Sequence, residues 1–251
     1  MTSIAVHVSG LTKIYGHTPA LTDVSFHVTQ GSITALLGGN GAGKTTTISL
    51  LLGLLTPTSG KIVLMGKEMP KGRSRVLPRM NFGSPYVDLP KRLSVRQNLN
   101  VFARLYGLRE PERRIDQLCN ELGLEKFIDG PTGNLSSGQA TRVALAKALI
   151  NAPSILLLDE PTASLDPDTA DWVRCYLENY NKITGATILL ASHNMSEVER
   201  MCSSILIMKN GRIVERGSPE NLLIKHKKKT LEEVFIEISR SSIDLCFHKD
   251  S

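Results

Sequence analysis

Hydrophobic and polar residues alternate along the first thirty positions in the manner of β-strands. Apolar side chains recur at about every second position around Ile4–Val8 and again around Leu21–Val28, and the turn residues Gly31-Ser32 follow. The run from Ile33 to Leu37 predicts a buried strand, and residues 46–52 predict a helix directly after it. The chain is therefore predicted to begin with strands, followed by a buried strand that leads directly into a helix.

A helical pattern occupies residues 94 to about 150. Ser94 and Gln97 have the spacing of a capping box, in which each side chain satisfies a backbone N–H group at the start of a helix. Three helices are predicted here, beginning near Ser94, Pro111 and Leu135. The segment before them, residues 73–90, is rich in proline and basic residues, and we expect it to be irregular.

After Pro153 strands and helices alternate. Strands are predicted at 154–159, 186–192, 205–208 and 212–214, and helices at 168–182, 195–202 and 230–240, with a frayed end beyond. Strands that alternate with helices favour a mainly parallel sheet covered by helices. The fold class is therefore α/β, with the helical stretch as an inserted subdomain.

Composition suits one sizeable α/β core, because 41% of the 251 residues are hydrophobic and 22% are charged. We expect no membrane span and no secretory leader, and the four widely spaced cysteines are expected to be reduced thiols. The net charge is +6, and a basic run lies at Lys225–Lys229. We interpret this run as a solvated linker; contact with an anionic membrane is the alternative, and nucleic-acid binding is not expected.

A glycine-rich segment after the first buried strand has the spacing of a P-loop. Its glycines let successive backbone N–H groups face one point, and the following helix adds its positive end. Lys44 would reach the β- and γ-phosphates of a nucleoside triphosphate, and the Thr45 hydroxyl would contact Mg²⁺. The predicted nucleotide contacts are Gly38, Gly39, Asn40, Gly41, Ala42, Gly43, Lys44, Thr45 and Thr46. The alternative is an ordinary glycine-rich turn.

Two carboxylates follow the apolar run that begins at Ile155. In a P-loop protein a Walker-B aspartate ends a strand beside the P-loop strand, so Asp159 is expected to hold Mg²⁺, and we expect these two strands to be neighbours. Glu160 is placed to accept a proton from the water that attacks the γ-phosphate, or to polarise it. Behind a P-loop, this interpretation is favoured over a simple strand exit.

The order of these motifs resembles the nucleotide-binding subunits of ATP-binding-cassette (ABC) transporters over about residues 3–225. Leu135-Ser136-Ser137-Gly138-Gln139 is similar to their LSGGQ signature, with Ser137 in place of the first glycine. Ala163-Ser164-Leu165-Asp166 is similar to the D-loop, and His193 ends a strand where the family has its switch histidine. Tyr15 matches the aromatic residue that stacks on adenine.

This resemblance implies a P-loop ABC core with a parallel sheet, a small N-terminal antiparallel β subdomain and a helical subdomain at about 86–150. The ATPase domain would be 1–225, and 226–251 would be a basic linker with a helical tail. The resemblance assigns catalysis to Lys44, Glu160 and His193, and Mg²⁺ to Thr45 and Asp159. It adds the nucleotide contacts Tyr15, Ser136, Gly138, Gln139 and Asp166.

The family also implies partners. Two ATP molecules are sandwiched in a head-to-tail dimer, because the signature helix faces the ATP of the other subunit, in either a homodimer or a heterodimer. A separate membrane permease would carry the cargo, with this ATPase peripheral on the cytoplasmic face, and the tail near residues 231–235 is similar to exporter-type subunits. The alternatives are a soluble ABC ATPase acting on ribosomes or DNA, and an ATP-binding subunit with little hydrolysis.

One departure from the family pattern concerns a glutamine that contacts Mg²⁺ and the attacking water. Its position falls on Pro85, which offers no side chain for this role. Between the P-loop sheet and the helical insert, the segment Pro85 to Arg92 is expected to form an exposed groove edge that docks the permease, with Tyr86, Val87 and Leu89 partly exposed. In the alternative, Tyr86 and Leu89 pack beneath the helical subdomain.

Overall fold

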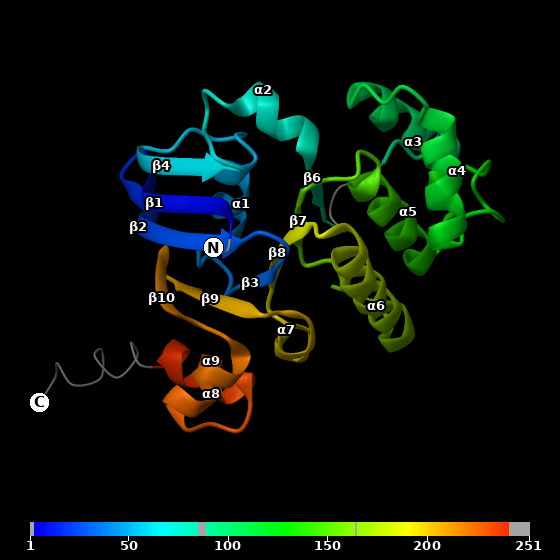
Figure 1. Ribbon diagram of the computed structural model, residues 1–251. Helices are drawn as coiled ribbons and strands as arrows, with labels where there is room; N and C mark the ends of the chain where they lie inside the picture. The colour runs from blue at the N-terminus through cyan, green and yellow to red at the C-terminus, as the bar shows by residue number, and fades with distance from the viewer. Residues whose placement is uncertain (1–2, 85–88, 164, 241–251) are drawn as a thin grey trace, which may run out of the picture.

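The computed structural model describes residues 3–84, 89–163 and 165–240, and at its centre is a six-stranded sheet (Figure 1). The strand order is β10-β9-β3-β8-β7-β6, and every neighbouring pair is parallel except β9 and β10. The strands are β3 (Ile33–Gly38), β6 (Met80–Gly83), β7 (Ile155–Asp159), β8 (Thr187–Ser192), β9 (Ser204–Lys209) and β10 (Arg212–Gly217). All residues of β3 and β8 are buried, as expected for parallel strands covered on both faces.

A second, antiparallel sheet forms at the N-terminal end of the chain, in the order β2-β1-β4-β5. Its strands are β1 (Ile4–Tyr15), β2 (Thr18–Thr29), β4 (Ser59–Leu64) and β5 (Lys67–Glu68). Side chains alternate between the faces of a strand, so Leu36 of β3 packs toward this sheet and helix α1 (Lys44–Leu51), whereas Ala35 and Leu37 pack toward other helices. The central sheet therefore separates two hydrophobic cores, and the predicted α/β fold class is confirmed.

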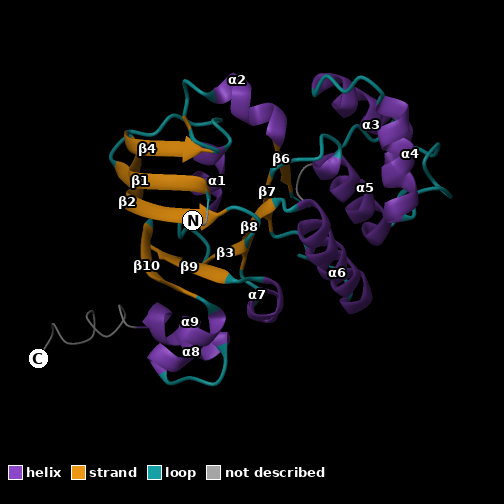
Figure 2. Cartoon of the chain, viewed as in Figure 1, coloured by secondary structure: helices purple, strands orange, loops and turns teal. Residues whose placement is uncertain are grey.

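Within the described parts of the chain, helices lie on several sides of the strands, but none lies to the left of the N-terminal sheet in the view of Figure 2. The predicted helical insert is present as α3 (Val95–Leu105), α4 (Pro111–Leu122) and α5 (Ser137–Leu149), with the short turn η2 (Thr132–Asn134) before α5. These three helices lie together on the side away from the N-terminal sheet (Figure 1). Helices α6 (Pro167–Thr184) and α7 (Met195–Met201) follow β7 and β8, so the insert interrupts an otherwise regular strand–helix order.

The prediction that residues 73–90 are irregular is wrong for most of this segment. It contains α2 (Arg73–Val76), η1 (Leu77–Arg79) and the edge strand β6. Strand β6 has only four residues, and one of them is the buried polar Asn81. The Asn81 amide donates to Lys147 O (3.1 Å) and Asn151 Oδ1 (2.8 Å). A strand this short, with a polar residue inside, lacks the apolar alternation by which strands are predicted.

The basic run Lys225–Lys229, interpreted above as a solvated linker, ends one helix and leads into the next, and most of its side chains are exposed. Helices α8 (Pro219–His226) and α9 (Leu231–Arg240) form a hairpin beside β10 (Figure 1). Lys225 Nζ lies 2.6 Å from Glu215 Oε2, and Lys228 Nζ lies 3.1 Å from Glu237 Oε2. Across the described ranges, no helix has the length and apolarity to cross a membrane.

Candidate functional site

The loop between β3 and α1 has glycine where the backbone needs it. Gly41 and Gly43 have φ angles of +76° and +107°, in the region that glycine tolerates best. A Cβ atom on Gly38 would lie 2.7 Å from Ala42 Cβ and 2.8 Å from Met208 O, closer than atoms can approach. By contrast, a Cβ on Gly39 meets nothing within 4 Å. Three of the four glycines are therefore required by the shape of the loop.

Lys44 lies inside this loop. It is 9% exposed, and its Nζ donates to Gly38 O (2.7 Å) and Gly39 O (3.3 Å). Helix α1 begins at Lys44, and its N-cap residue, Gly43, provides no side-chain cap. Its first N–H groups are consequently available to an anion, because the first turn of a helix has no carbonyl partners of its own. The loop combines a buried ammonium with uncapped donors, the chemistry that binds phosphates.

Asp159 ends β7 and meets the loop through Thr45, whose Oγ1 lies 3.4 Å from Asp159 Oδ2. The sequence-based expectation that this strand lies beside the P-loop strand is wrong, because β8 separates β7 from β3. The contact forms even so, because carboxyl ends of parallel strands share one edge of the sheet. Burial raises the pKa of Asp159, and the neighbouring Glu160 charge raises it further.

Glu160 and His193 meet at the same edge. Their strands are neighbours, and His193 Nδ1 lies 2.5 Å from Glu160 Oε2. The His193 side chain is 68% exposed, whereas that of Glu160 is 14% exposed. Glu160 has a φ of +54°, which is unusual for a residue with a side chain, and its N–H donates to Ala191 O (2.8 Å). The His193 ring thus lies between the largely buried Glu160 carboxylate and solvent.

A second group of candidate residues lies at the starts of α5 and α6. Ser136 caps α5 as a capping box: Gln139 N donates to Ser136 Oγ (3.3 Å), and Ser136 N donates to Gln139 Oε1 (3.0 Å). Asp166 caps α6 by accepting from Thr169 N (3.0 Å), and this bond lowers its pKa. A Cβ on Gly138 would lie 3.3 Å from Thr169 Oγ1, so the two helix starts adjoin.

Tyr15 lies at the end of β1, and Pro85 lies outside the described residues. The Tyr15 ring is 47% exposed, and Lys13 Nζ lies 5.1 Å from the ring centre. This aromatic surface is accessible for stacking. The roles predicted for individual site residues stay predictions, although the structure brings Lys44, Thr45 and Asp159 together, and likewise Ser136 and Asp166.

Comparison with known proteins adds independent evidence. The family model described as "ABC transporter" matches residues 21–163. The chain belongs to the ABC transporter family. The "Nod factor export ATP-binding protein I" of Rhizobium sp. (strain N33) is 36% identical over 241 residues, covering 94% of this chain and 78% of that protein. Among further relatives with this name, the chain spans as little as 64% of the relative.

Solved structures agree with this assignment. A structure entitled "Structure of ATP binding subunit of ABC transporter" is similar with a TM-score of 0.85 and 30% identity, covering 94% of this chain and 99% of that one. CbiO1 from Clostridium perfringens, described as part of the ABC transporter complex cbiONQ, has a TM-score of 0.80 and 33% identity, covering 89% and 92%. This chain is thus an ATP-binding subunit of an ABC transporter.

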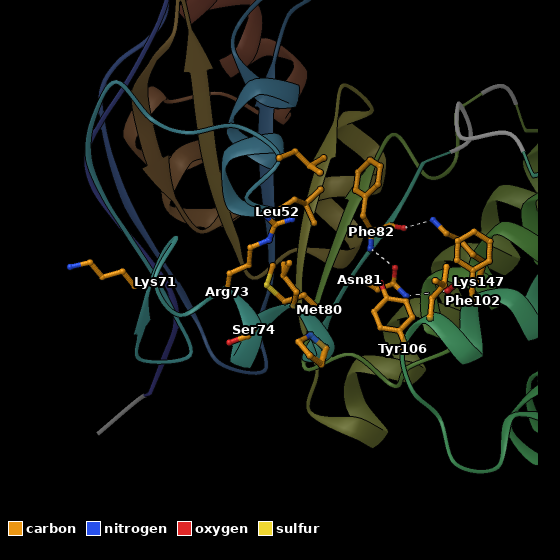
Figure 3. Close-up of a pocket in the computed structure, with 14 residues that line it drawn as sticks. Leu52, Lys71, Arg73, Ser74, Met80, Asn81, Phe82, Phe102, Tyr106 and Lys147 are labelled. Atoms are coloured by element: carbon orange, nitrogen blue, oxygen red, sulfur yellow. Dashed lines mark hydrogen bonds between the residues drawn. The ribbon is translucent and has the colours of Figure 1, made fainter.

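The ABC subunit also has a groove whose lining residues the sequence-based predictions do not name. It has a volume of about 830 Å³ and lies between the end of α1, the α2–β6 segment and α3 (Figure 3). Lys147 of α5 borders it, with Nζ donating to Phe82 O (3.2 Å), and burial lowers the pKa of this lysine. Leu54 and Leu105 also line it, and they are 69% and 75% exposed. Because the lining comes from distant segments, no local pattern reveals it.

Leu89 belongs to the expected docking edge. It is half-buried, as that prediction requires, and it also packs against the hydrophobic core formed partly by the helical subdomain, as the alternative requires, so both interpretations stay predictions. Tyr86 and Val87 lie outside the described residues. Among the described residues of this region, the groove contains leucines that are more exposed than Leu89, namely Leu54 and Leu105.

Proposed function

We propose that this subunit hydrolyses ATP to drive export through a separate membrane permease. The observation that carries the proposal is the Glu160–His193 pair, 2.5 Å apart at the edge where Asp159 meets the P-loop. A carboxylate beside the phosphate site is what water activation needs, and an imidazole can hold it and face developing charge. A site built only to bind ATP has no need of that pair.

Nucleotide binding uses the P-loop. Lys44 exchanges the carbonyls of Gly38 and Gly39 for the charged oxygens of the β- and γ-phosphates, which are stronger acceptors. Thr45 and Asp159 fit Mg²⁺, because a hydroxyl and a carboxylate are the hard oxygen donors that this ion prefers. When bound there, Mg²⁺ supplies positive charge that offsets the phosphate charge.

Hydrolysis then follows from the placement of Glu160. Its carboxylate accepts a proton from the attacking water while the water oxygen bonds to the γ-phosphorus and the bond to the β–γ bridging oxygen breaks. ADP and inorganic phosphate leave, and the proton passes from Glu160 to solvent or phosphate. His193 holds the carboxylate and faces the γ-phosphate side, where its exposed ring is accessible.

The second group of residues completes the site of another subunit. Ser136, Gly138 and the start of α5 form a second phosphate-facing helix end, and one triphosphate does not need two such cradles from one chain. We propose a head-to-tail dimer, with a second copy or a related subunit, in which α5 faces the partner's ATP. Asp166, at the adjoining start of α6, would lie at the same interface.

Export is favoured over import because the relatives are named as export ATP-binding proteins. The same names and the transporter complex of CbiO1 favour a permease partner over a role on ribosomes or DNA. The subunit would then be peripheral on the cytoplasmic face of the membrane. Mass spectrometry of what co-purifies with the tagged subunit from solubilised membranes tests this. A polytopic membrane chain is expected, and ribosomal or DNA-bound partners alone would contradict it.

The groove is the proposed docking site for the permease. We expect Leu54→Ser with Leu105→Ser to weaken membrane association at least about tenfold, because each buried leucine contributes roughly 1.5–3 kcal/mol. Both side chains are exposed in the free subunit, so its melting temperature and basal ATPase should stay nearly unchanged. Co-sedimentation with permease-containing membranes measures the effect.

Ile183→Ser with Ile224→Ser is the matched control for this pair. These isoleucines are 82% and 76% exposed and do not line the groove. Wild-type association is expected for the control. Equal loss in both double variants, or no loss in the groove variant, would show that the permease docks elsewhere.

A further inference from the structure

Glu197 is the one fully buried carboxylate in the part of the chain that the structure describes, with 1% exposure. It lies in the first turn of α7. Its Oε1 accepts from Thr162 Oγ1 (2.9 Å), and its Oε2 accepts from Ser192 Oγ (2.7 Å). A buried carboxylate is costly unless its oxygens are satisfied, and here each oxygen has one hydroxyl donor.

The two donors belong to the segments that carry the proposed catalytic pair. Thr162 lies two residues after Glu160, in the loop that leaves β7. Ser192 is the last residue of β8, directly before His193. Ser192 Oγ also accepts from Asn194 N (3.0 Å), so its proton is free to donate to Glu197. The Glu197 side chain thus joins the loop that carries Glu160 to the end of β8, which precedes His193.

The backbone at Glu160 needs such support. Its φ of +54° is a left-handed conformation that residues with a side chain avoid. Unusual backbone conformations persist where surrounding contacts hold them. Besides the Glu197–Thr162 bond, the loop is held by Glu160 N to Ala191 O (2.8 Å) and Ala163 N to Glu160 O (3.0 Å).

We propose that Glu197 is a positioning residue for ATP hydrolysis. Its hydrogen bonds to Thr162 and Ser192, called the clamp below, fix the loop after β7 to the end of β8 and so maintain the contact between Glu160 and His193. The inference rests on the proposed hydrolysis, but the clamp itself is a property of the free subunit. The charged groups that face Glu197 are Glu160 and Arg174, from the β7 loop and α6. Burial raises the pKa of Glu197, while the two hydroxyl donors oppose that shift.

A purely structural role makes different predictions. If Glu197 only fills the core, its replacement lowers stability without a specific effect on turnover. If it positions the pair, turnover falls while ATP affinity stays, because the P-loop is not part of the clamp. The ratio of the change in kcat to the change in ATP Kd therefore separates the two roles.

The test compares Glu197→Gln with Thr162→Val. Glutamine keeps the volume but replaces one acceptor by an NH₂ donor, and valine removes the Thr162 hydroxyl. We expect each variant to lower kcat at least about tenfold with ATP Kd within about twofold of wild type. The double variant should be no slower than the slower single variant, because both changes release one clamp.

Asn181→Leu is the matched control. The Asn181 amide donates to Gly31 O (2.9 Å) and Ala186 O (2.6 Å), so it joins segments at the opposite ends of β3 and β8. This variant also loses two hydrogen bonds, here partly buried ones, and we expect it to lower the melting temperature but to keep kcat per folded subunit. A similar fall of kcat in Asn181→Leu would overturn the specific role of Glu197.

Hydrogen exchange of the nucleotide-free subunit tests the clamp without any activity. The amides of Glu160, Thr162 and Ala163 and those of residues 192–195 should exchange faster in Glu197→Gln and Thr162→Val, and at the wild-type rate in Asn181→Leu. Unchanged exchange, or kcat values equal to wild type in both clamp variants, would overturn the inference. Absence of ATPase in the wild-type subunit would instead count against the proposed hydrolysis, while the exchange data would still decide on the clamp.

Discussion

Replacing Lys44 by alanine is expected to abolish measurable ATP binding. The Lys44 ammonium is buried in the loop, where it donates to the carbonyls of Gly38 and Gly39 and where phosphate oxygens would replace them. Hydrogen bonds to charged groups contribute roughly 1.5–3 kcal/mol each, and two phosphates would each accept one. The expected loss is therefore about 3 kcal/mol or more, at least roughly a hundredfold in Kd.

Equilibrium binding of a fluorescent ATP analogue measures this loss, and Arg114→Ala is the control. Arg114 also donates to two main-chain carbonyls, Leu149 O (2.7 Å) and Ile150 O (3.2 Å), at the end of α5. The control loses the same kind of contact and should bind ATP normally. Near wild-type ATP affinity in Lys44→Ala, with the fold intact by circular dichroism, would contradict the proposal that this loop binds the phosphates.

Local signals are sufficient for the parts of the fold that depend on neighbours in sequence. The capping box predicted at α3 is confirmed: Gln97 N donates to Ser94 Oγ (3.1 Å) and Ser94 N to Gln97 Oε1 (2.9 Å). The P-loop is similar in kind, because its glycines, its lysine and its helix all lie between Gly38 and Leu51. Such features are determined by backbone geometry over one or two turns.

At helix α8 the composition of the basic run dominates the sequence-based prediction, although weaker signs of a helix start are present. Ser218 caps it by accepting from Asn221 N (3.2 Å), and Pro219 occupies its first turn, which are ordinary signs of a helix start. The basic run that ends this helix favours a linker by composition. Positive charge is nevertheless stabilising at a helix C-terminus, where it lies near unpaired carbonyls. The basic residues Lys225 and His226 are therefore compatible with the last turn of α8.

Features that depend on distant segments could not be predicted. The order of the central sheet places β8 between β3 and β7, and nothing in the three strand sequences records that order. Glu197 resembles an ordinary acidic residue in the first turn of a helix, and its partner Thr162 lies 35 residues away. Its role becomes visible only once the two segments are packed together.

Glu160→Gln is expected to leave ATP bound but to lower turnover by about 10²–10⁴-fold, the usual contribution of a general base. The amide keeps the shape of the side chain but does not accept a proton from water. Because the ATP sandwich would no longer be opened by hydrolysis, the same variant should accumulate as a dimer. Phosphate release measures the first effect, and light scattering with ATP and Mg²⁺ measures the second.

Glu237→Gln is a close control, because Glu237 Oε1 also faces a histidine nitrogen, His226 Nδ1 at 3.2 Å, but in the α8–α9 hairpin. It should retain wild-type turnover and should not dimerise more strongly. Two outcomes would count against the proposals separately. Persistent turnover in Glu160→Gln would exclude Glu160 as the base, whereas a slow variant that stays monomeric at high protein and ATP concentrations would exclude the head-to-tail sandwich. The isolated wild-type subunit cannot make this distinction, because hydrolysis would continually dissolve the dimer that the measurement seeks.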